Sequence, residues 1–307
     1  PSSAGNPHQR RSSLCIVFVH TNYRHYLFLA TKLNNPGFKF VYEVHTKVGM
    51  PWKDDLCISD EWALGTEIYQ SLSSGQMLLP EKANSLTLQA YLKMCDLPFI
   101  VKERANVEHM SPSGEGPFLK FNSSLFSDFE VIISFLSSKG ISLTHQLESD
   151  TKKNIRTYLS LVHNVLGSAE QYICWYDDTI FKSVTMFRYS SAYCWPIDVC
   201  LTRLKRRKVL GKLQAIEWTS KSLEQMYIEV DHCCSILSDV LADQTFFYGE
   251  YPTEIDAAVF GHLFSLLSAE LPGCKFGEII RGYQNLYAHS LFIKETYLSE
   301  TGSEDDF

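Results

Sequence analysis

The chain of 307 residues is long enough for about two domains, and its 45% hydrophobic content is sufficient for buried cores. The formal net charge of -7 argues against nucleic-acid binding as the main function, because recognition of phosphates requires a basic surface. Nine cysteines without a CxxC pair, in a chain too large to need disulfide staples, favour a reducing compartment.

The first 62 residues differ in composition from the rest of the chain. Glu43 is the first acidic residue, whereas arginines and serines precede it, as in a mitochondrial presequence. The sequence NNPG breaks any continuous amphipathic helix there, and KFVYEVHTKV alternates like a strand. We therefore predict that residues 1–62 form an extension that is peripheral to the main fold or poorly ordered.

Residues 63–145 show the signals of a small α/β domain. QMLL predicts a short strand, and Pro80 then leads to a helix cap at Asn84 or Ser85. The segment SLTLQAYLKMC that follows has the apolar spacing of a helix. LPFIVKERA predicts a second strand, so that one helix would connect the first two strands.

Two more strands and a second helix complete this predicted domain. Pro117 marks the start of the third strand, because proline is excluded from a central ladder, and SSLFSD predicts the fourth. The helix from Phe129 to Lys139 ends before Gly140, a favoured residue after a helix. A helical crossover predicts that the first two strands are parallel, and the short later connections predict antiparallel pairing.

From residue 146 to residue 297 the pattern is helical throughout, which predicts an all-helical second domain. Pro196 interrupts this pattern. The acidic and polar composition of residues 298–307 predicts a disordered tail. No apolar run reaches the roughly 18 to 20 residues that span a bilayer. The predicted helices cover residues 151–175, 201–216, 223–241, 254–269 and 276–297.

The segment PTEIDAAVFGHL contains a capping box at the start of an apolar helix. Thr253 can accept a hydrogen bond from the backbone N–H of Asp256, and the carboxylate of Asp256 can accept one from the N–H of Thr253. Such a box matters most where a helix begins inside the protein, as the apolar run after it indicates. The pattern alone is equally compatible with an ordinary surface cap.

Two clusters of charged or metal-ligating residues lie on the predicted helices. Asp231, His232, Cys233 and Cys234 are consecutive, so that they point about 100° apart and cannot converge on one ion; we predict no metal site. The basic run RLKRRKVLGKLQ suits anionic lipid headgroups or an acidic partner, with an ordinary solvated helix face as the alternative. Its candidate interaction residues are Arg203, Lys205, Arg206, Arg207 and Lys208.

A proline before the third strand and a Thr-x-x-Asp cap within the second domain resemble the glutathione transferase fold. This resemblance implies a thioredoxin-like domain over residues 63–145, followed by a helical bundle over residues 146–297. It also implies that the Gly116–Pro117 peptide bond is cis, and that Thr253 and Asp256 cap a buried helix.

Glutathione chemistry requires a Tyr, Ser or Cys near the end of the first strand to activate a thiol. Ser85 is the only hydroxyl that the predicted elements place there, and helix capping is the favoured explanation, because serine is preferred at such a position for capping alone. Transferases of this fold place Glu-Ser or a close variant after the fourth strand, where this chain has Ser127 and Asp128. Because both positions depart from the pattern, we predict no enzyme activity and no cofactor, and keep a glutathione-dependent transferase as the alternative.

A narrower resemblance lies in the amino-acid sequence of several segments, which are similar to the metaxins of the metaxin-2 type. The resemblance covers roughly residues 61–297. These segments include SLTLQAYLKMCDLPFIVKERANVEHMSPSGEGPF, YSSAYCWPIDV, EQMYIEVDHCCSILS and FFYGEYPTEIDAAVFGHLFSLL. The resemblance implies a peripheral protein on the cytosolic face of the mitochondrial outer membrane, within the machinery that sorts and assembles β-barrel proteins. It implies a heterodimer with a metaxin-1-type subunit and contact with the β-barrel assembly channel. A role in motor-based transport of mitochondria, through an outer-membrane GTPase and motor adaptors, is compatible with it.

Overall fold

The computed structural model describes residues 15–21, 24–30, 41–44, 65–269 and 271–298. The chain divides into two compact units, residues 1–59 and residues 60–307. The first unit contains an antiparallel sheet of β1 (Cys15–Thr21), β2 (Arg24–Ala30) and β3 (Val41–Val44) in that order. The strand predicted in KFVYEVHTKV is thus present in part, whereas β1 and β2 were not predicted. Most of the predicted extension and the predicted acidic tail after residue 298 lie outside the described residues.

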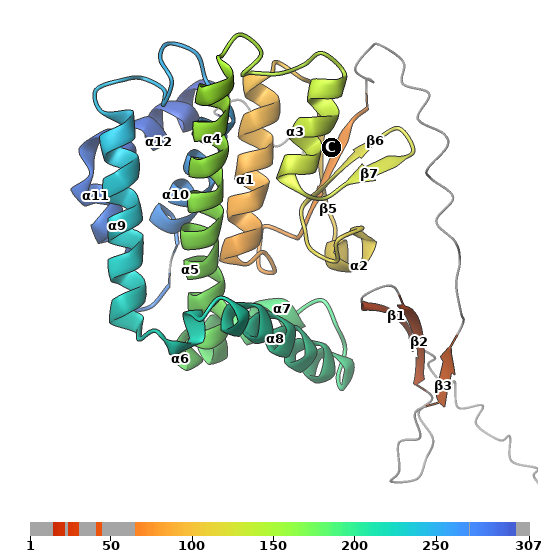
Figure 1. Ribbon diagram of the computed structural model, residues 1–307. Helices are drawn as coiled ribbons and strands as arrows, with labels where there is room; N and C mark the ends of the chain where they lie inside the picture. Colours follow the sequence, from red (N-terminus) through yellow and green to blue (C-terminus); the bar gives the residue numbers. More distant parts are fainter. Residues whose placement is uncertain (1–14, 22–23, 31–40, 45–64, 270, 299–307) are drawn as a thin grey trace, which may run out of the picture. The chain divides into compact units, whose positions relative to one another are not determined.

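The second unit begins with a four-stranded sheet in the order β5-β4-β6-β7. As predicted, β4 and β5 are parallel and the β6–β7 hairpin is antiparallel. The antiparallel pairing of β6 with β4, which is its neighbour in the sheet but not in the chain, was not predicted. Helix α1 connects the parallel pair, and Figure 1 shows it between the sheet and the helices that follow. The elements are β4 (Glu67–Gln70), α1 (Leu79–Met94), β5 (Ile100–Glu103), α2 (Val107–Met110), β6 (Phe118–Phe121), β7 (Ser124–Phe126) and α3 (Phe129–Ser138).

The predicted first strand and the predicted cap of the first helix are wrong. QMLL is not a strand: its last residue, Leu79, is the first residue of α1, and the strand is EIYQ, nine residues earlier. Pro80 lies in the first turn of α1, where the missing N–H is harmless. Asn84 and Ser85 therefore lie inside the helix rather than at its start.

A long helical rod opens the second half of this unit, where the sequence predicts one helix over residues 151–175. It consists of α4 (Ser149–Val162), the π-helical segment η1 (His163–Gly167), α5 (Ser168–Gln171) and a second π-helical segment, η2 (Tyr172–Tyr176). Beyond a break at Asp177 come α6 (Asp178–Ile180), a third π-helical segment η3 (Phe181–Thr185) and α7 (Met186–Ser190), which were not predicted.

The remaining helices follow the predicted positions closely. Pro196 precedes α8, and the Trp195–Pro196 peptide bond is cis. Tyr283 separates the last two helices, which were predicted as one. None of the described helices is long and apolar enough to cross a membrane. The bounds are α8 (Ile197–Ala215), η4 (Trp218–Ser220), α9 (Leu223–Leu241), α10 (Glu254–Leu267), α11 (Phe276–Gly282) and α12 (Gln284–Tyr297).

Helix α10 is the centre of the second unit, because almost every one of its side chains is buried. It crosses α1 at Gly261, where the two helices approach so closely that a Cβ atom would lie 2.1 Å from the hydroxyl oxygen of Thr87 and 2.6 Å from the carbonyl oxygen of Ala83. Ala257 and Phe260 of α10 belong to the same apolar core as Ile68 of β4. The sheet layer and the helical layer therefore share one core.

Candidate functional site

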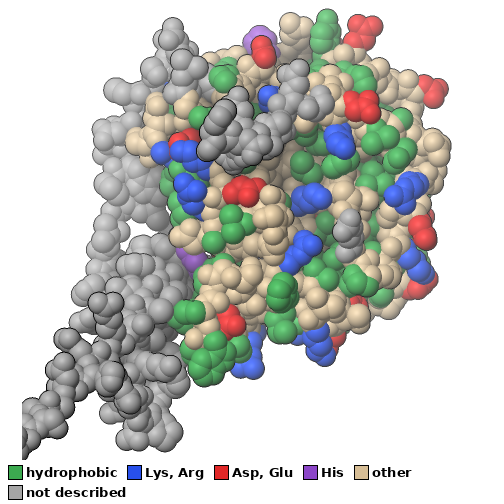
Figure 2. Space-filling model, turned by 180° about the vertical axis from the view of Figure 1, so that it is seen from behind, with side chains coloured by type: hydrophobic (Ala, Val, Ile, Leu, Met, Phe, Trp, Pro, Cys, Tyr) green, Lys and Arg blue, Asp and Glu red, His purple; other side chains and the backbone are tan. Residues whose placement is uncertain are grey.

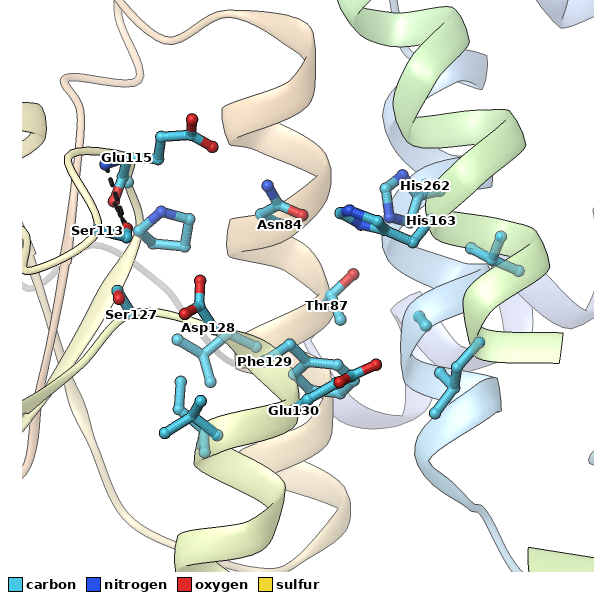
Figure 3. A pocket seen from close by; sticks show the side chains of 18 residues that line it. Asn84, Thr87, Ser113, Glu115, Ser127, Asp128, Phe129, Glu130, His163 and His262 are labelled. Carbon is cyan, nitrogen blue, oxygen red and sulfur yellow. Dashed lines mark hydrogen bonds between the residues drawn. The ribbon is translucent and has the colours of Figure 1, made fainter. Parts of the chain in front are cut away.

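A cleft of about 470 Å³ lies between the loop before β6 and the helices α1, α3, α4 and α10. Pro117, whose peptide bond with Gly116 is cis, lines it on the side of the sheet. Ser127 and Asp128 also line it, and Figure 3 shows them at the start of α3, with Asn84 and Thr87 on α1. The structure thus brings together three of the residues singled out in the sequence.

The start of α3 presents acidic groups to the cleft. Asp128 is exposed and holds the position before the first residue of α3, while its backbone carbonyl accepts the N–H of Ile132 at 3.0 Å. Glu130 lies in the first turn and also lines the cleft. An ammonium group is the natural partner of such carboxylates, whereas an anionic ligand would be repelled from them.

Ser85 lies elsewhere. It is buried on α1, donates a hydrogen bond to the side-chain oxygen of Gln70, and does not line the cleft. The amide nitrogen of Gln89 donates to both of these groups at 3.0 Å, which closes a buried polar network between α1 and β4. Ser85 is therefore a structural residue, and it neither caps the helix nor stands where a thiol could be activated.

The loop from β4 to α1 holds three serines, Ser71, Ser73 and Ser74. They were not predicted as site candidates, because the first strand was placed at QMLL. None of the three lines the cleft or the small cavity beside the start of α1. The alternation of buried and half-buried residues in EIYQ, followed by a serine- and glycine-containing turn, is the signal that locates this loop.

The small cavity at the start of α1, about 40 Å³ in volume, has no hydroxyl or thiol in its lining. Glu81 lines it from the first turn of α1, and burial raises the pKa of this carboxyl group from 4.5 to about 7, although Lys205 opposes the shift. Asn84, Lys205 and Lys212 line the same cavity, so a thiolate held at this helix start would face the Glu81 carboxyl group and two cations, but no hydroxyl or thiol.

Ion pairs join α8 to α2 and to the loop before β6. Lys205 lies 2.8 Å from a carboxylate oxygen of Glu108 on α2, and both side chains are mostly buried. Lys212 donates a hydrogen bond to Glu115, and Lys208 lies 3.9 Å from the same carboxylate. Burial alone would raise the pKa of Glu115, but its bond with Lys212 holds the pKa below its usual range.

The basic run on α8 is therefore largely engaged within the protein. Arg206 donates to the backbone carbonyl of Trp175 at 3.0 Å and to Asp178 at 2.6 Å, and lies over the ring of Phe181 at 3.9 Å. Arg203 and Arg207 are exposed and form no ion pair or hydrogen bond with the residues that the structure describes. Of the five predicted interaction residues, only these two present an unengaged charge.

Two buried acid–histidine pairs hold α10 in place. On one side of the helix, His262 lies 2.9 Å from Glu170 of α5, and burial raises the pKa of that carboxyl group. At the start of the helix, Asp256 is the acceptor of a buried network. His262 also lines the cleft, beside the exposed His163 (Figure 3).

The Asp256 network extends the predicted capping box. Its carboxylate accepts the backbone N–H of Thr253 at 2.8 Å, the hydroxyl of Thr253 at 2.7 Å, the N–H of Phe247 at 3.0 Å and the Nε2–H of His289 at 3.0 Å. Thr253, Asp256 and His289 are all buried, so water cannot replace these bonds. The helix thus begins inside the protein, and one side chain joins three segments of chain there.

The described residues contain no group of three or more His, Cys, Asp and Glu side chains that could hold a metal ion. Cys233 and Cys234 are buried on α9, where burial raises the pKa of Cys233 to about 12. Asp231 instead accepts a hydrogen bond from the hydroxyl of Tyr283 at 2.9 Å. Burial likewise raises the pKa of Cys95 to about 12, so its thiol stays protonated at neutral pH.

Comparisons with known proteins agree with this architecture. The model of the "Glutathione S-transferase N-terminal domain" matches residues 83–180, and that of the "Glutathione S-transferase, C-terminal domain" matches residues 230–291. The crystal structure of the β-etherase LigF from Sphingobium sp. strain SYK-6 superposes with a TM-score of 0.52 at 14% identity, over 75% of this chain and 94% of that one. The chain therefore has a glutathione-transferase-like fold.

Relatives found by sequence similarity identify the family within this fold. Metaxin-2 of Homo sapiens is 38% identical over 247 residues, which are 80% of this chain and 94% of the relative. Metaxin-1 of Mus musculus is 28% identical over 239 residues, or 76% of this chain and 75% of the relative. The chain belongs to the metaxin family.

Proposed function

We propose that this chain is a non-catalytic adaptor on the cytosolic face of the mitochondrial outer membrane. In this role it pairs with a metaxin-1-type subunit in the machinery that sorts and assembles β-barrel proteins and supports protein import. The observation that carries the proposal is the similarity to human metaxin-2, which extends over 94% of that protein. The same similarity covers 80% of this chain, which supports a shared kind of partner.

The state of the transferase site supports the non-catalytic part of this proposal. The cavity at the start of α1 is lined by Glu81 where an activating hydroxyl or thiol is needed, and Ser85 is engaged with Gln70. The cleft near Ser127 retains space and the carboxylates of Asp128 and Glu130 for an ammonium group, which supports a glutathione-dependent transferase as the second candidate.

A conjugation assay separates these two candidates. The purified full chain, mixed with glutathione and a standard electrophile that changes absorbance on conjugation, is expected to give no rate above the uncatalysed reaction, because the cavity at the start of α1 offers no hydroxyl or thiol to activate the glutathione thiol. Turnover that Asp128→Ala abolishes, in a variant that still unfolds with the same midpoint, would establish the transferase instead.

Isolation of the tagged chain from mitochondria tests the adaptor role directly. We expect a metaxin-1-type subunit to be recovered in about equal amount with the chain, together with the β-barrel assembly channel, since heterodimer contacts of this kind are built from complementary surfaces. A second tagged chain that lacks residues 1–60 examines whether the first unit takes part. Recovery of the full chain without any outer-membrane protein contradicts the proposal.

A further inference from the structure

The hairpin of α7 and α8 exposes large aromatic side chains to solvent. Phe187 on α7 is 74% exposed and Trp195 in the turn before α8 is 71% exposed, and Met186 and Val199 nearby are also exposed. Side chains of this size are normally covered in a folded protein, and their exposure at one end of a hairpin indicates a contact surface. Figure 1 shows α7 and α8 side by side along one edge of the second unit.

The outer face of α8 continues this surface with positive charge. Val199, Arg203 and Arg207 are spaced four residues apart and therefore share one stripe of the helix, and Leu204, half exposed, lies beside them. Figure 2, which views the molecule from behind, shows hydrophobic and charged side chains interspersed over the described surface of that face. The hairpin surface comprises Phe187, Trp195, Val199, Arg203, Leu204 and Arg207.

The charge of the segment is opposite to that of the whole chain. Residues 181–216 contain eight Lys and Arg residues and one acidic residue, Asp198, in a protein with a formal net charge of -7. Most of these cations are engaged in internal pairs, but Arg203 and Arg207 are exposed without such a pair among the described residues. The two arginines thus present positive charge to solvent on the same hairpin as the exposed aromatic rings.

We propose that the hairpin surface docks on the headgroup region of an anionic bilayer. Trp195 and Phe187 would enter the interfacial zone, where aromatic rings are favoured, while Arg203 and Arg207 contact anionic headgroups. The observations favour lipid over a protein partner because exposed aromatic rings and two arginines without an ion pair among the described residues occur together on a basic hairpin of an acidic chain, a combination that suits the interfacial zone of an anionic bilayer. This inference rests on the peripheral membrane location proposed above.

Vesicle co-sedimentation tests the proposal. The full chain is expected to bind vesicles of phosphatidylcholine and phosphatidylserine in equal parts, and to bind phosphatidylcholine vesicles far more weakly. The double variant Arg203→Glu with Arg207→Glu is expected to lower the partition coefficient on anionic vesicles by at least about tenfold, because two attractive charges become repulsive. High salt is expected to weaken the binding of the unmodified chain.

A matched double variant controls for overall charge. Lys153→Glu with Arg156→Glu changes the net charge by the same amount on exposed positions of α4, and it is expected to leave vesicle binding close to that of the unmodified chain. An equal loss in both double variants, or no loss in the α8 variant, overturns the proposal. Equal urea midpoints for the variants establish that the fold is retained.

Quenching by brominated lipid locates the tryptophan. With brominated phosphatidylcholine in the anionic vesicles, fluorescence of a chain that carries Trp52→Phe and Trp62→Phe is expected to fall. Trp195→Phe in that background is expected to remove most of that fall, since Trp175 and Trp218 are buried. Recovery of the metaxin-1-type subunit by the same variants is measured separately. If the α8 variant binds vesicles normally but loses that subunit, the hairpin surface is a protein contact and the lipid proposal is wrong, while the adaptor role stands.

Discussion

Replacement of Asp256 with alanine is expected to lower the free energy of unfolding by about 3 to 5 kcal/mol, because it leaves several buried donors without an acceptor. The backbone N–H groups of Phe247 and Thr253, the hydroxyl of Thr253 and the ring N–H of His289 all donate to this one carboxylate. Urea unfolding followed by far-UV circular dichroism at neutral pH measures the change.

An exposed capping box supplies the control. Ser222 and Gln225 form the same reciprocal pair at the start of α9, but both are exposed, so water can replace their hydrogen bonds. Ser222→Ala is expected to cost about 1 kcal/mol. A loss for Asp256→Ala no larger than that for Ser222→Ala would show that the buried network contributes nothing beyond an ordinary helix cap.

Replacement of Gly261 with alanine is expected to destabilise the protein by about 3 kcal/mol, at the upper end of the usual cost of overpacking. The new Cβ atom would lie 2.1 Å from the hydroxyl oxygen of Thr87 and 2.6 Å from two backbone atoms of α1, the nitrogen of Thr87 and the carbonyl oxygen of Ala83. Rotation of a side chain cannot relieve contacts with backbone, so the two helices must separate and open the shared core.

Gly211 on α8 is the matched comparison, because a Cβ atom there meets nothing within 4 Å and the residue is helical and exposed. Gly211→Ala is expected to stabilise the protein by about 0.5 to 1 kcal/mol through the higher helix propensity of alanine. Thermal and urea unfolding of the two variants should therefore shift in opposite directions. A neutral Gly261→Ala variant would mean that the α1–α10 contact is loose.

Strong local signals predicted much of the fold. The crossover helix specified the parallel pair β4–β5 and the short turn specified the antiparallel hairpin β6–β7, and the periodic apolar runs located α9 and α10 to within two residues. The first strand was misplaced because β4 has only two buried residues, Ile68 and Gln70, and one of them is polar. QMLL is more hydrophobic than EIYQ, so a hydrophobic pattern favours it as the strand. Pro80, directly after it, instead marks the beginning of a helix.

The candidate site was predicted only in part, because its geometry depends on contacts between distant segments. Ser127, Asp128 and Pro117 could be located, since they adjoin strands that the pattern identifies. The engagement of Ser85 by Gln70, and of Arg206 by Trp175 and Asp178, could not be foreseen from spacing along the chain. A charged residue in a basic run is available to a partner only if the fold leaves it unbound.

The two π-helical segments of the long rod bear on any attempt to redesign it. An i→i+5 turn holds about one residue more than an α turn, so a helical wheel drawn through Ser149–Tyr176 assigns the wrong face to side chains after His163. Deleting a single residue from His163–Gly167 would restore regular winding but rotate Glu170 by about 100° away from His262. The irregular winding thus sets which side of the rod faces the other helices. A rod redesigned as a regular α-helix would turn different side chains toward them.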